Sequence, residues 1–374
     1  MIPYPFFHDD APVDISFVFE KEKPAGKHGF LTVQGRHFVF EDGTPVKFWG
    51  TNFNGAGCFP EKPYAEKLAK RLAKIGLNLV RFHQLEADFS TPNIFQFTKG
   101  KRLDNTSTFD PESMDRLDYL VHCLKQEGIY IYLDLMTYRK FKEGDDVPFH
   151  ELLCDNAKPW SITNPRLIEL QKEYAYNYWN HVNQYTGVAY KDDPQFVLLD
   201  ITNENDLFRP FNYNYKWKRI KYYDDEFRTM FRSWLNERGI EYDAEGCDLD
   251  GKDQPLMQFK METNKKFART MYDHIRSLGV KIPLCCTNWE KGNGLIMAQE
   301  EMDFQDGHYY YYDWSWTEYE KISQNKSLMD SSDFPMGNKI SNRIHGQPYV
   351  MTEWDMPWPN SYRCEAPLWF PAMG

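Results

Sequence analysis

The sequence has no pair of cysteines at the Cys-x-x-Cys spacing that is typical of zinc sites and redox motifs. Seven cysteines are scattered along the 374 residues, and their number is odd. A disulfide framework and a structural zinc site are therefore not expected, and free thiols in a reducing compartment are the simplest interpretation. The N-terminus also lacks the basic start and apolar stretch of a signal peptide. We therefore expect a cytoplasmic protein, or a secreted one if the sequence has been trimmed.

Long apolar runs and basic runs are absent as well. No stretch approaches the roughly 18 apolar residues of a transmembrane helix, and the mean hydropathy is −0.68. Lys and Arg number 44 against 55 Asp and Glu, which gives a formal net charge of −11. These features argue against a nucleic-acid partner and against an anionic membrane surface. The sequence does not indicate an oligomeric state.

Aromatic residues, in contrast, are abundant. They make up 17% of the chain, with 24 Tyr, 27 Phe and 11 Trp. Such a composition excludes intrinsic disorder for most of the chain. Aromatic side chains build large cores and also form flat surfaces on which the apolar faces of ligands stack. We expect most of them to lie in the core and a minority to line a binding site.

Apolar segments with different periodicities divide the chain into two parts. Residues 1–45 are expected to form an N-terminal extension, with a strand over 15–19, and a β-hairpin whose arms lie in 30–40 and 46–50 around an Asp42-Gly43 turn. Residues 46–374 are expected to form one domain in which strands alternate with helices. The predicted strands are 46–53, 77–82, 129–135, 196–201, 282–287, 304–312 and 348–352. The predicted helices are 64–75, 111–126, 164–185, 224–238 and 256–278.

Two α/β architectures fit this alternation, an open doubly wound sheet and a (β/α)8 TIM barrel. No glycine-rich phosphate loop follows the first strand, which disfavours the dinucleotide-binding version of the open sheet. Polar and aromatic residues follow nearly every strand, as the active-site face of a barrel requires. We therefore predict a TIM barrel, preceded by the hairpin, whose eighth strand is missing from this chain. The strand-end residues are Asn52, Asn54, Arg81, His83, Asp134, Tyr138, Asn203, Glu204, Asn205, Trp289, His308, Tyr310, Glu353 and Trp354.

Two of these strand ends carry a glutamate, Glu204 and Glu353. In a closed barrel, the fourth and seventh strands lie across the mouth from one another. Two carboxylates that face a shared cleft are what glycosidic bond cleavage needs, one as a nucleophile or base and the other as an acid. A separation of about 5–5.5 Å would retain the anomeric configuration, and a wider one would invert it. The acid needs a raised pKa and the nucleophile a lowered one.

Further motifs accompany the two glutamates along most of the chain. They are Gly29-Phe30-Leu31, Lys47-Phe48-Trp49-Gly50-Thr51-Asn52, Val80-Arg81-Phe82-His83, Asn203-Glu204 and His308-Tyr309-Tyr310. With these motifs the chain resembles the clan-A glycoside hydrolases, the cellulase-like barrels of glycoside hydrolase family 5 and its neighbours. One departure is the stretch Asp134-Leu135-Met136, which lacks a histidine that the family often carries there.

The resemblance implies a retaining glycoside hydrolase that acts on a β-linked neutral glycan such as a glucan or mannan. It implies that Glu204 is the acid/base and Glu353 the nucleophile. Asn203 would contact the sugar 2-hydroxyl, Arg81 would keep Glu353 ionised, and Tyr310 would orient it. We predict that the sugar site also includes His83, His308 and Trp289, with Trp289 as a stacking platform. An oligo- or polysaccharide is the expected partner, and no metal or other cofactor is expected.

Two other functions stay open. One is a carbohydrate-binding barrel without activity, or an inactive fragment of a larger glycosidase, which the missing eighth strand would favour. The other is a metal-dependent hydrolase with an ion held by His83, Asp134, His308 and Glu353, but no metal-binding His motif supports it. The sugar, the linkage and the choice between endo and exo action depend on loops 84–110, 138–163, 205–223 and 313–346.

Overall fold

The structure is a computed structural model that describes residues 14–153, 155–209, 219–289, 292–310, 325–330, 342–356 and 360–373. Parts of the aromatic-rich loops 205–223 and 313–346 therefore lie outside the described residues. The same holds for the last two residues of the strand predicted over 304–312.

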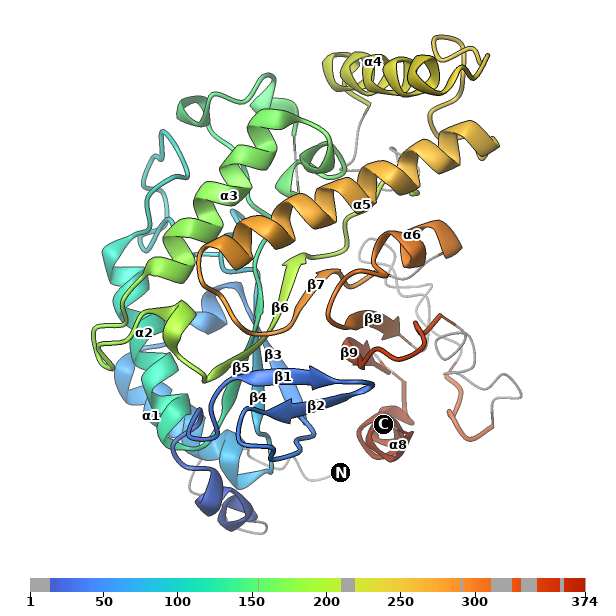
Figure 1. The fold of residues 1–374 in the computed structure, drawn as a ribbon. Coiled ribbons are helices and arrows are strands. Elements are labelled where there is room, and N and C mark those ends of the chain that lie inside the picture. Colours follow the sequence, from blue (N-terminus) through green and yellow to red (C-terminus); the bar gives the residue numbers. More distant parts are fainter. Residues whose placement is uncertain are drawn as a thin grey trace.

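Five parallel strands in sequence order form the central sheet. They are β3 (Gly50–Asn54), β4 (Leu79–His83), β5 (Tyr130–Asp134), β6 (Phe196–Thr202) and β7 (Leu284–Thr287). Every residue of β5, β6 and β7 is buried, as expected for parallel strands that are covered on both faces. Helices α1 (Lys62–Lys74), α2 (Pro111–Gln126), α3 (Pro165–Asn180) and α5 (Gln254–Ser277) lie along the outer face of this sheet (Figure 1). Helix α4 (Lys221–Arg238) lies beyond the end of the sheet, next to α5, and α6 (Asn293–Ala298) follows β7.

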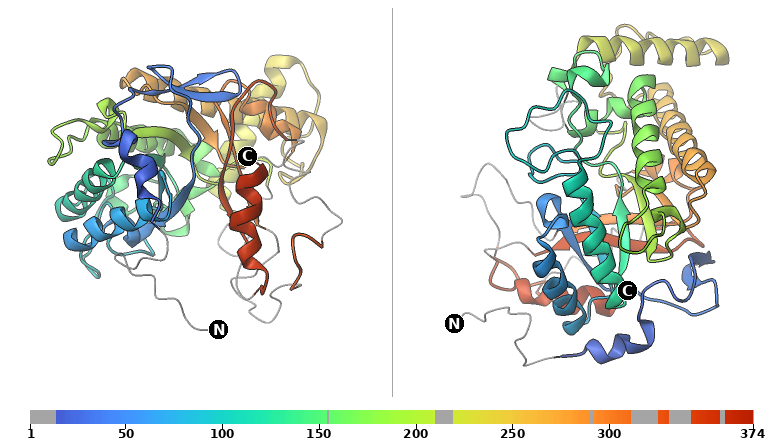
Figure 2. Two further views of the ribbon diagram at one scale, coloured as in Figure 1. Left: turned by 90° about the horizontal axis from the view of Figure 1, so that it is seen from below. Right: turned by 90° about the vertical axis from the view of Figure 1, so that its left-hand side faces the viewer.

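The last two strands, β8 (Gln305–Tyr310) and β9 (Tyr349–Asp355), form a parallel sheet of their own. Strand β9 of this pair contacts β3, where Asn52 Nδ2 donates to the Thr352 carbonyl oxygen at 3.0 Å. The rings of Trp49 and Trp354 also stack there, at 5.3 Å between centroids. Strands β3–β9 thus follow the order of a TIM barrel that is not closed, and the described residues contain no further barrel strand after β9. Helix α8 (Ala366–Met373) follows β9 (Figure 2).

The N-terminal hairpin, β1 (Leu31–Gln34) with β2 (His37–Phe40), closes one end of the barrel. Leu31 and Phe40 belong to the same buried cluster as Tyr130 and Leu198. The Phe40 ring lies 5.1 Å from that of Tyr130, the first residue of β5. The hairpin therefore covers the amino-terminal end of the strands, and the carboxyl end is left for a functional site.

Two sequence-based expectations near the N-terminus are wrong. The strand predicted over 15–19 is the 3₁₀ helix η1 (Ser16–Glu22), because the Asp14 side chain accepts hydrogen bonds from Ser16 N (3.0 Å) and Ser16 Oγ (2.7 Å) and starts a turn. The hairpin turns at Gly35-Arg36 rather than at Asp42-Gly43. Gly35 has φ = +60°, which such a two-residue turn requires. Asp42-Gly43 forms a second turn just after β2, between Phe40 and Thr44.

Two helices begin at the asparagine or aspartate that the sequence indicates. Asp110 Oδ1 accepts from the backbone N–H groups of Glu112 (3.0 Å) and Ser113 (3.2 Å) at the start of α2. Asn164 Oδ1 accepts from Leu167 N (3.1 Å) at the start of α3. Helix α3 ends at Asn180, five residues before the expected end at 185.

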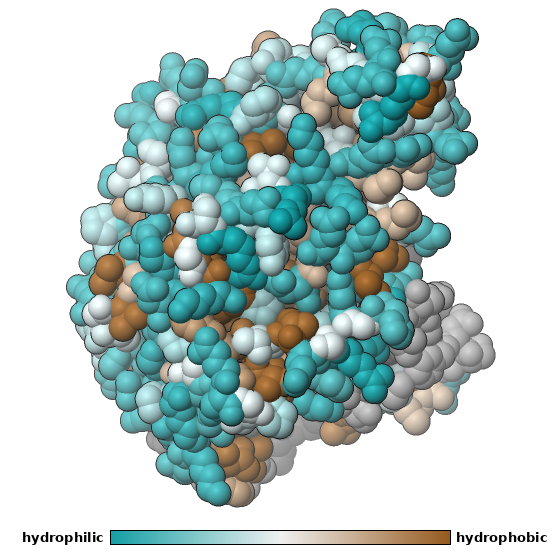
Figure 3. Space-filling model, in the orientation of Figure 1, coloured by the Kyte–Doolittle hydropathy of each residue, from teal (hydrophilic) through white to brown (hydrophobic). Residues whose placement is uncertain are grey.

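The surface seen in Figure 3 is mostly hydrophilic, with separate small apolar areas. Throughout the described part of the chain, the helices are too short or too polar to cross a membrane.

Arg139 is a buried cation that joins loops on the outside of the sheet. Its guanidinium donates to Thr106 Oγ1 (2.9 Å), to the Thr106 carbonyl oxygen (2.9 Å) and to the Leu170 carbonyl oxygen (2.8 Å). It also lies over the ring of Phe141, 5.0 Å from the centroid. Only 1% of the residue is exposed, so these acceptors have no access to water that could replace the guanidinium.

We expect Arg139→Met to lower the free energy of unfolding by about 3 kcal/mol, because buried carbonyl oxygens lose a charged donor. Urea denaturation followed by fluorescence measures this loss. Lys221→Met is the matched control, since Lys221 pairs with Asp225 on the surface of α4. We expect the control to change the free energy of unfolding by less than about 0.5 kcal/mol. Equal effects of the two substitutions would contradict the role given to Arg139.

Candidate active site

Glu204 and Glu353 meet at the carboxyl end of the barrel strands. Glu204 follows β6, and Glu353 lies in β9. The imidazole of His308, on β8, joins them: its Nδ1 lies 2.9 Å from Glu204 Oε1 and 3.5 Å from Glu353 Oε2. One ligand-type atom from each of the three side chains falls within 4.8 Å of the others. The structure thus brings together three residues that are far apart in the sequence.

Arg81, in β4, lies beneath the two glutamates and is only 2% exposed. Its NH1 donates to Glu353 Oε1 at 3.0 Å, and its NH2 donates to Asp134 Oδ2 at 2.7 Å and to Asn203 Oδ1 at 3.3 Å. Burial would lower the pKa of Arg81, but the charges of Asp134 and Glu353 raise it further above its ordinary value. The guanidinium therefore stays charged and holds Glu353 and Asn203 in place.

Glu353 has two further polar neighbours. The Tyr310 hydroxyl donates to its Oε2 at 2.7 Å, and His83 Nε2 lies 3.6 Å from its Oε1. His83 in turn is hydrogen-bonded to Asp134. Burial would raise the pKa of Glu353, but the charges of His308, Arg81 and His83 and the hydrogen bond from Tyr310 hold it well below the usual range. Glu353 is therefore an ionised carboxylate, as a nucleophile needs to be.

Glu204 differs from the sequence-based expectation of a raised pKa. Burial would raise it, but the hydrogen bond and the charge of His308 lower the pKa of Glu204 below its ordinary value. The pKa of His308 is raised: burial lowers it, and the charges of Glu353 and Glu204 more than offset that effect. The contact between the two groups thus favours a charged imidazole beside an ionised Glu204.

Asn288 is a site residue that the sequence analysis missed. Its Oδ1 accepts from Glu204 N at 2.7 Å, and its Nδ2 donates to Asn203 Oδ1 at 2.8 Å. The backbone of Glu204 has φ = +44°, a left-handed conformation that costs free energy in a residue with a side chain. Asn288 helps to hold that conformation. It directly follows β7, so the pattern of polar residues at strand ends could have identified it.

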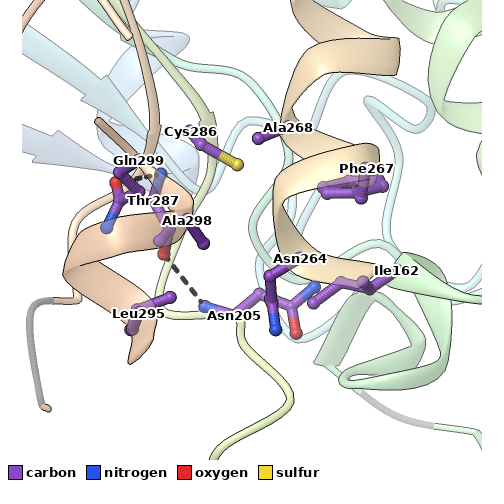
Figure 4. Close-up of a pocket in the computed structure, with 10 residues that line it drawn as sticks. All are labelled: Ile162, Asn205, Asn264, Phe267, Ala268, Cys286, Thr287, Leu295, Ala298 and Gln299. Carbon is purple, nitrogen blue, oxygen red and sulfur yellow. Dashed lines mark hydrogen bonds between the residues drawn. The ribbon is translucent and has the colours of Figure 1, made fainter. Parts of the chain in front are cut away.

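Trp289, the predicted stacking platform, is only 8% exposed, and the guanidinium of Arg209 lies against its ring. Its role in sugar stacking stays a prediction. A small cavity behind Asn205 is lined by residues of β7, α5 and α6 (Figure 4). Its volume of about 10 Å³ can hold about one water molecule.

A metal ion is conceivable at Glu204, His308 and Glu353 by distance alone. The charge of Arg81, 3.0 Å from Glu353, opposes a cation there. Hydrogen bonding among the three side chains already accounts for their approach, so we assign no metal to this site.

Comparisons with known proteins identify the fold of the chain. No family model and no curated protein matches the sequence. Solved structures do match. An endo-1,4-beta-mannanase from Rhizomucor miehei has a TM-score of 0.56 at 16% identity, over 88% of this chain and 82% of that one. The chain has the fold of the clan-A, cellulase-like glycoside hydrolases.

Two structures from Thermotoga petrophila agree with this assignment of the fold. A hyperthermostable endo-1,4-beta-D-mannanase gives a TM-score of 0.53 at 16% identity, over 88% of this chain and 86% of that chain. An endo-beta-1,4-mannanase gives a TM-score of 0.52 at 16% identity, over 85% of this chain and 63% of that one. At this identity the glycoside hydrolase likeness is one of fold.

We expect Tyr310→Phe to raise the pKa of Glu353, because the carboxylate loses a hydrogen-bond donor at 2.7 Å. Since the pKa of Glu353 is low in the folded protein, its contribution to stability is present at neutral pH and is lost as the pH falls. Acid unfolding of the variant should therefore begin at a higher pH. NMR titration of ¹³C-labelled glutamate carboxyl groups measures the pKa directly. Tyr176→Phe on the surface of α3 is the control, and a Glu353 signal that titrates identically in all three proteins would refute the role of Tyr310.

Proposed function

We propose that this chain is a retaining glycoside hydrolase that cleaves β-linked neutral glycans. The observation that carries the proposal is the approach of Glu204 and Glu353, whose carboxylate oxygens lie within 4.8 Å across the mouth of the barrel. Retaining enzymes have their two carboxyl groups about 5–5.5 Å apart, whereas inverting enzymes leave room for a water molecule between the carboxylate and the sugar. The short separation therefore supports the retaining mechanism.

In this mechanism, Glu353 attacks the anomeric carbon while Glu204 protonates the leaving oxygen. The glycosidic C–O bond breaks, a covalent bond between the sugar and Glu353 forms, and the aglycone departs with the proton of Glu204. Glu204, now ionised, then takes a proton from a water molecule that attacks the same carbon and releases Glu353. The low pKa of Glu353 supports the role of nucleophile.

The proton for the first step would come from the hydrogen-bonded pair of His308 and Glu204, which are 2.9 Å apart. A leaving oxygen next to Glu204 would draw the proton from the imidazole to the carboxylate and onward. When Glu353 becomes part of an ester, it loses its charge, and that charge is the larger of the two that raise the pKa of His308. The pair would then bind its proton less tightly, in the step in which Glu204 has to act as a base.

The contacts to the sugar are part of the same proposal. Asn203 would bind the 2-hydroxyl group, since Arg81 and Asn288 both donate to its Oδ1 and thereby fix the amide. His83, His308 and Tyr310 surround Glu353 and would line the same subsite. Because the similar structures from Rhizomucor and Thermotoga are endo-mannanases, β-mannan and β-glucan oligosaccharides are the first substrates to test.

A barrel that binds carbohydrate without cleaving it is the second candidate. The lowered pKa of Glu204 favours a barrel that only binds carbohydrate, because a carboxylate without a proton cannot act as an acid. Substrate assays with variants at the two glutamates separate the candidates.

We expect Glu204→Gln to lower kcat/KM by about 10²–10⁴-fold on β-mannan or β-glucan oligosaccharides, because proton transfer to a poor leaving group is lost. On aryl β-glycosides with an acidic phenol, the first step should be nearly unaffected, since such a leaving group needs no proton. A burst of phenol followed by slow turnover would be the sign. An equal loss on both kinds of substrate would contradict the role of Glu204 as acid.

Glu353→Gln should abolish turnover of both substrate types, while binding of the oligosaccharide persists in calorimetry. Glu245→Gln is the control, since Glu245 is exposed and pairs with Arg232 far from the described site. Binding by the parent chain without turnover of any substrate in the panel would favour the non-catalytic barrel.

A further inference from the structure

The strands that carry the two glutamates belong to different sheets. Glu204 follows β6 of the five-stranded sheet, whereas Glu353 and His308 lie on β9 and β8. No ladder of backbone hydrogen bonds pairs β7 with β8 in the described residues. Side chains inside the barrel must therefore set the distance between Glu204 and Glu353.

Asp306, at the second position of β8, makes such a connection. It is completely buried. Its Oδ2 accepts from the Tyr132 hydroxyl of β5 and from Thr352 Oγ1 of β9, both at 2.7 Å. Its Oδ1 accepts from the backbone N–H groups of Thr352 at 3.2 Å and of Gly307 at 2.6 Å. A single carboxyl group thus joins β5 of the large sheet to both strands of the small one.

Asp306 also meets a second buried carboxyl group, that of Asp200 on β6. Asp200 is completely buried, and its side chain is hydrogen-bonded to that of Asp306. Its Oδ2 accepts from Asn288 Nδ2 at 3.1 Å, but its Oδ1 receives no hydrogen bond from the rest of the described protein. If both carboxyl groups were ionised, their charges would repel each other. A single proton held between them removes the repulsion, and Asp200 Oδ1, which receives no other hydrogen bond, is the atom with room to carry it.

We propose that Asp306 and Asp200 share one proton and that this hydrogen-bonded pair is a positioning device that holds the strands of Glu353 and Glu204 in register. The effect on catalysis rests on the proposed function. The shared proton itself does not, and it can be tested without any substrate.

The surroundings of the pair agree with a retained proton. Burial and the charge of Asp134 raise the pKa of Asp200 to about 6. Burial and the charge of Asp200 raise the pKa of Asp306 well above its ordinary value. At neutral pH the pair then carries one negative charge, opposite the guanidinium of Arg81, 3.8 Å from Asp200. The titratable and charged groups that face the pair are Arg81, Tyr132, Asp134, Cys285 and His308.

The sign of the effect on stability follows from the raised pKa. The stability due to the protonated group is fully present below the pKa of an ordinary aspartate, and it is lost as the pH rises through the pKa in the folded protein. An asparagine at 200 carries a donor that does not titrate. Its oxygen still accepts from Asn288, and its N–H group, in the place of Oδ1, can donate to Asp306.

The experiment compares Asp200→Asn and Asp306→Ala with the parent chain. We expect the melting temperature of Asp200→Asn, relative to the parent, to increase steadily between about pH 5 and pH 9. Asp225→Asn on the surface of α4 is the matched control, and its difference from the parent should stay constant over that range. A pH-independent difference for Asp200→Asn would overturn the shared proton.

Activity on the best substrate of the panel tests the positioning role. We expect Asp200→Asn to keep kcat/KM within about threefold at pH 7, and Asp306→Ala to lose about 10²-fold in kcat while its circular dichroism is that of a folded barrel. Full activity of Asp306→Ala, or equal losses in both variants, would overturn the positioning role. If the parent chain is inactive, the proposed function fails, while the melting curves still decide whether the proton is shared.

Discussion

The ion pairs of Arg81 are the interaction on which the rest of the site depends. A guanidinium that is 2% exposed reaches Asp134 at 2.7 Å and Glu353 at 3.0 Å, and thereby joins strands of both sheets. Buried charges are costly unless each is paired, and the loss of one partner leaves the others uncompensated. Since Arg81 carries the charge that several buried carboxylates share, its loss would leave Asp134 and Glu353 with less compensation for their burial.

Apolar side chains and polar side chains occupy opposite ends of the barrel interior. Its amino-terminal end is filled by apolar and aromatic side chains and covered by the hairpin. Its carboxyl end is a layer of charged and amide groups that satisfy one another, from Arg81 through Asn203 and Asn288. Most apolar burial therefore lies in the amino-terminal end and in the layer between the helices and the sheet, which allows the carboxyl end to keep the buried carboxyl groups that a folded protein would otherwise avoid.

The sequence predicts most of the architecture, because parallel strands and capped helices are local patterns. Helix α2 begins and ends at the expected residues, and the strand-end glutamates, His308 and Tyr310 converge as expected. What the sequence does not predict depends on long-range burial. The link between Asp306 and Tyr132 spans 174 positions, and the lowered pKa of Glu204 arises from His308, 104 positions away. Only the folded chain shows which carboxylates face which cations.

The left-handed backbone of Glu204 has a consequence for evolution and engineering. A φ of +44° suits glycine, and a side chain in this region costs roughly 1–2 kcal/mol. A selection for thermostability alone would therefore favour Glu204→Gly, and this substitution would remove the carboxylate. Any selection that keeps glutamate here has accepted a less stable chain in exchange for the position of one oxygen atom. At Glu204, a single dihedral angle thus sets the stability of the fold against the position of a carboxylate.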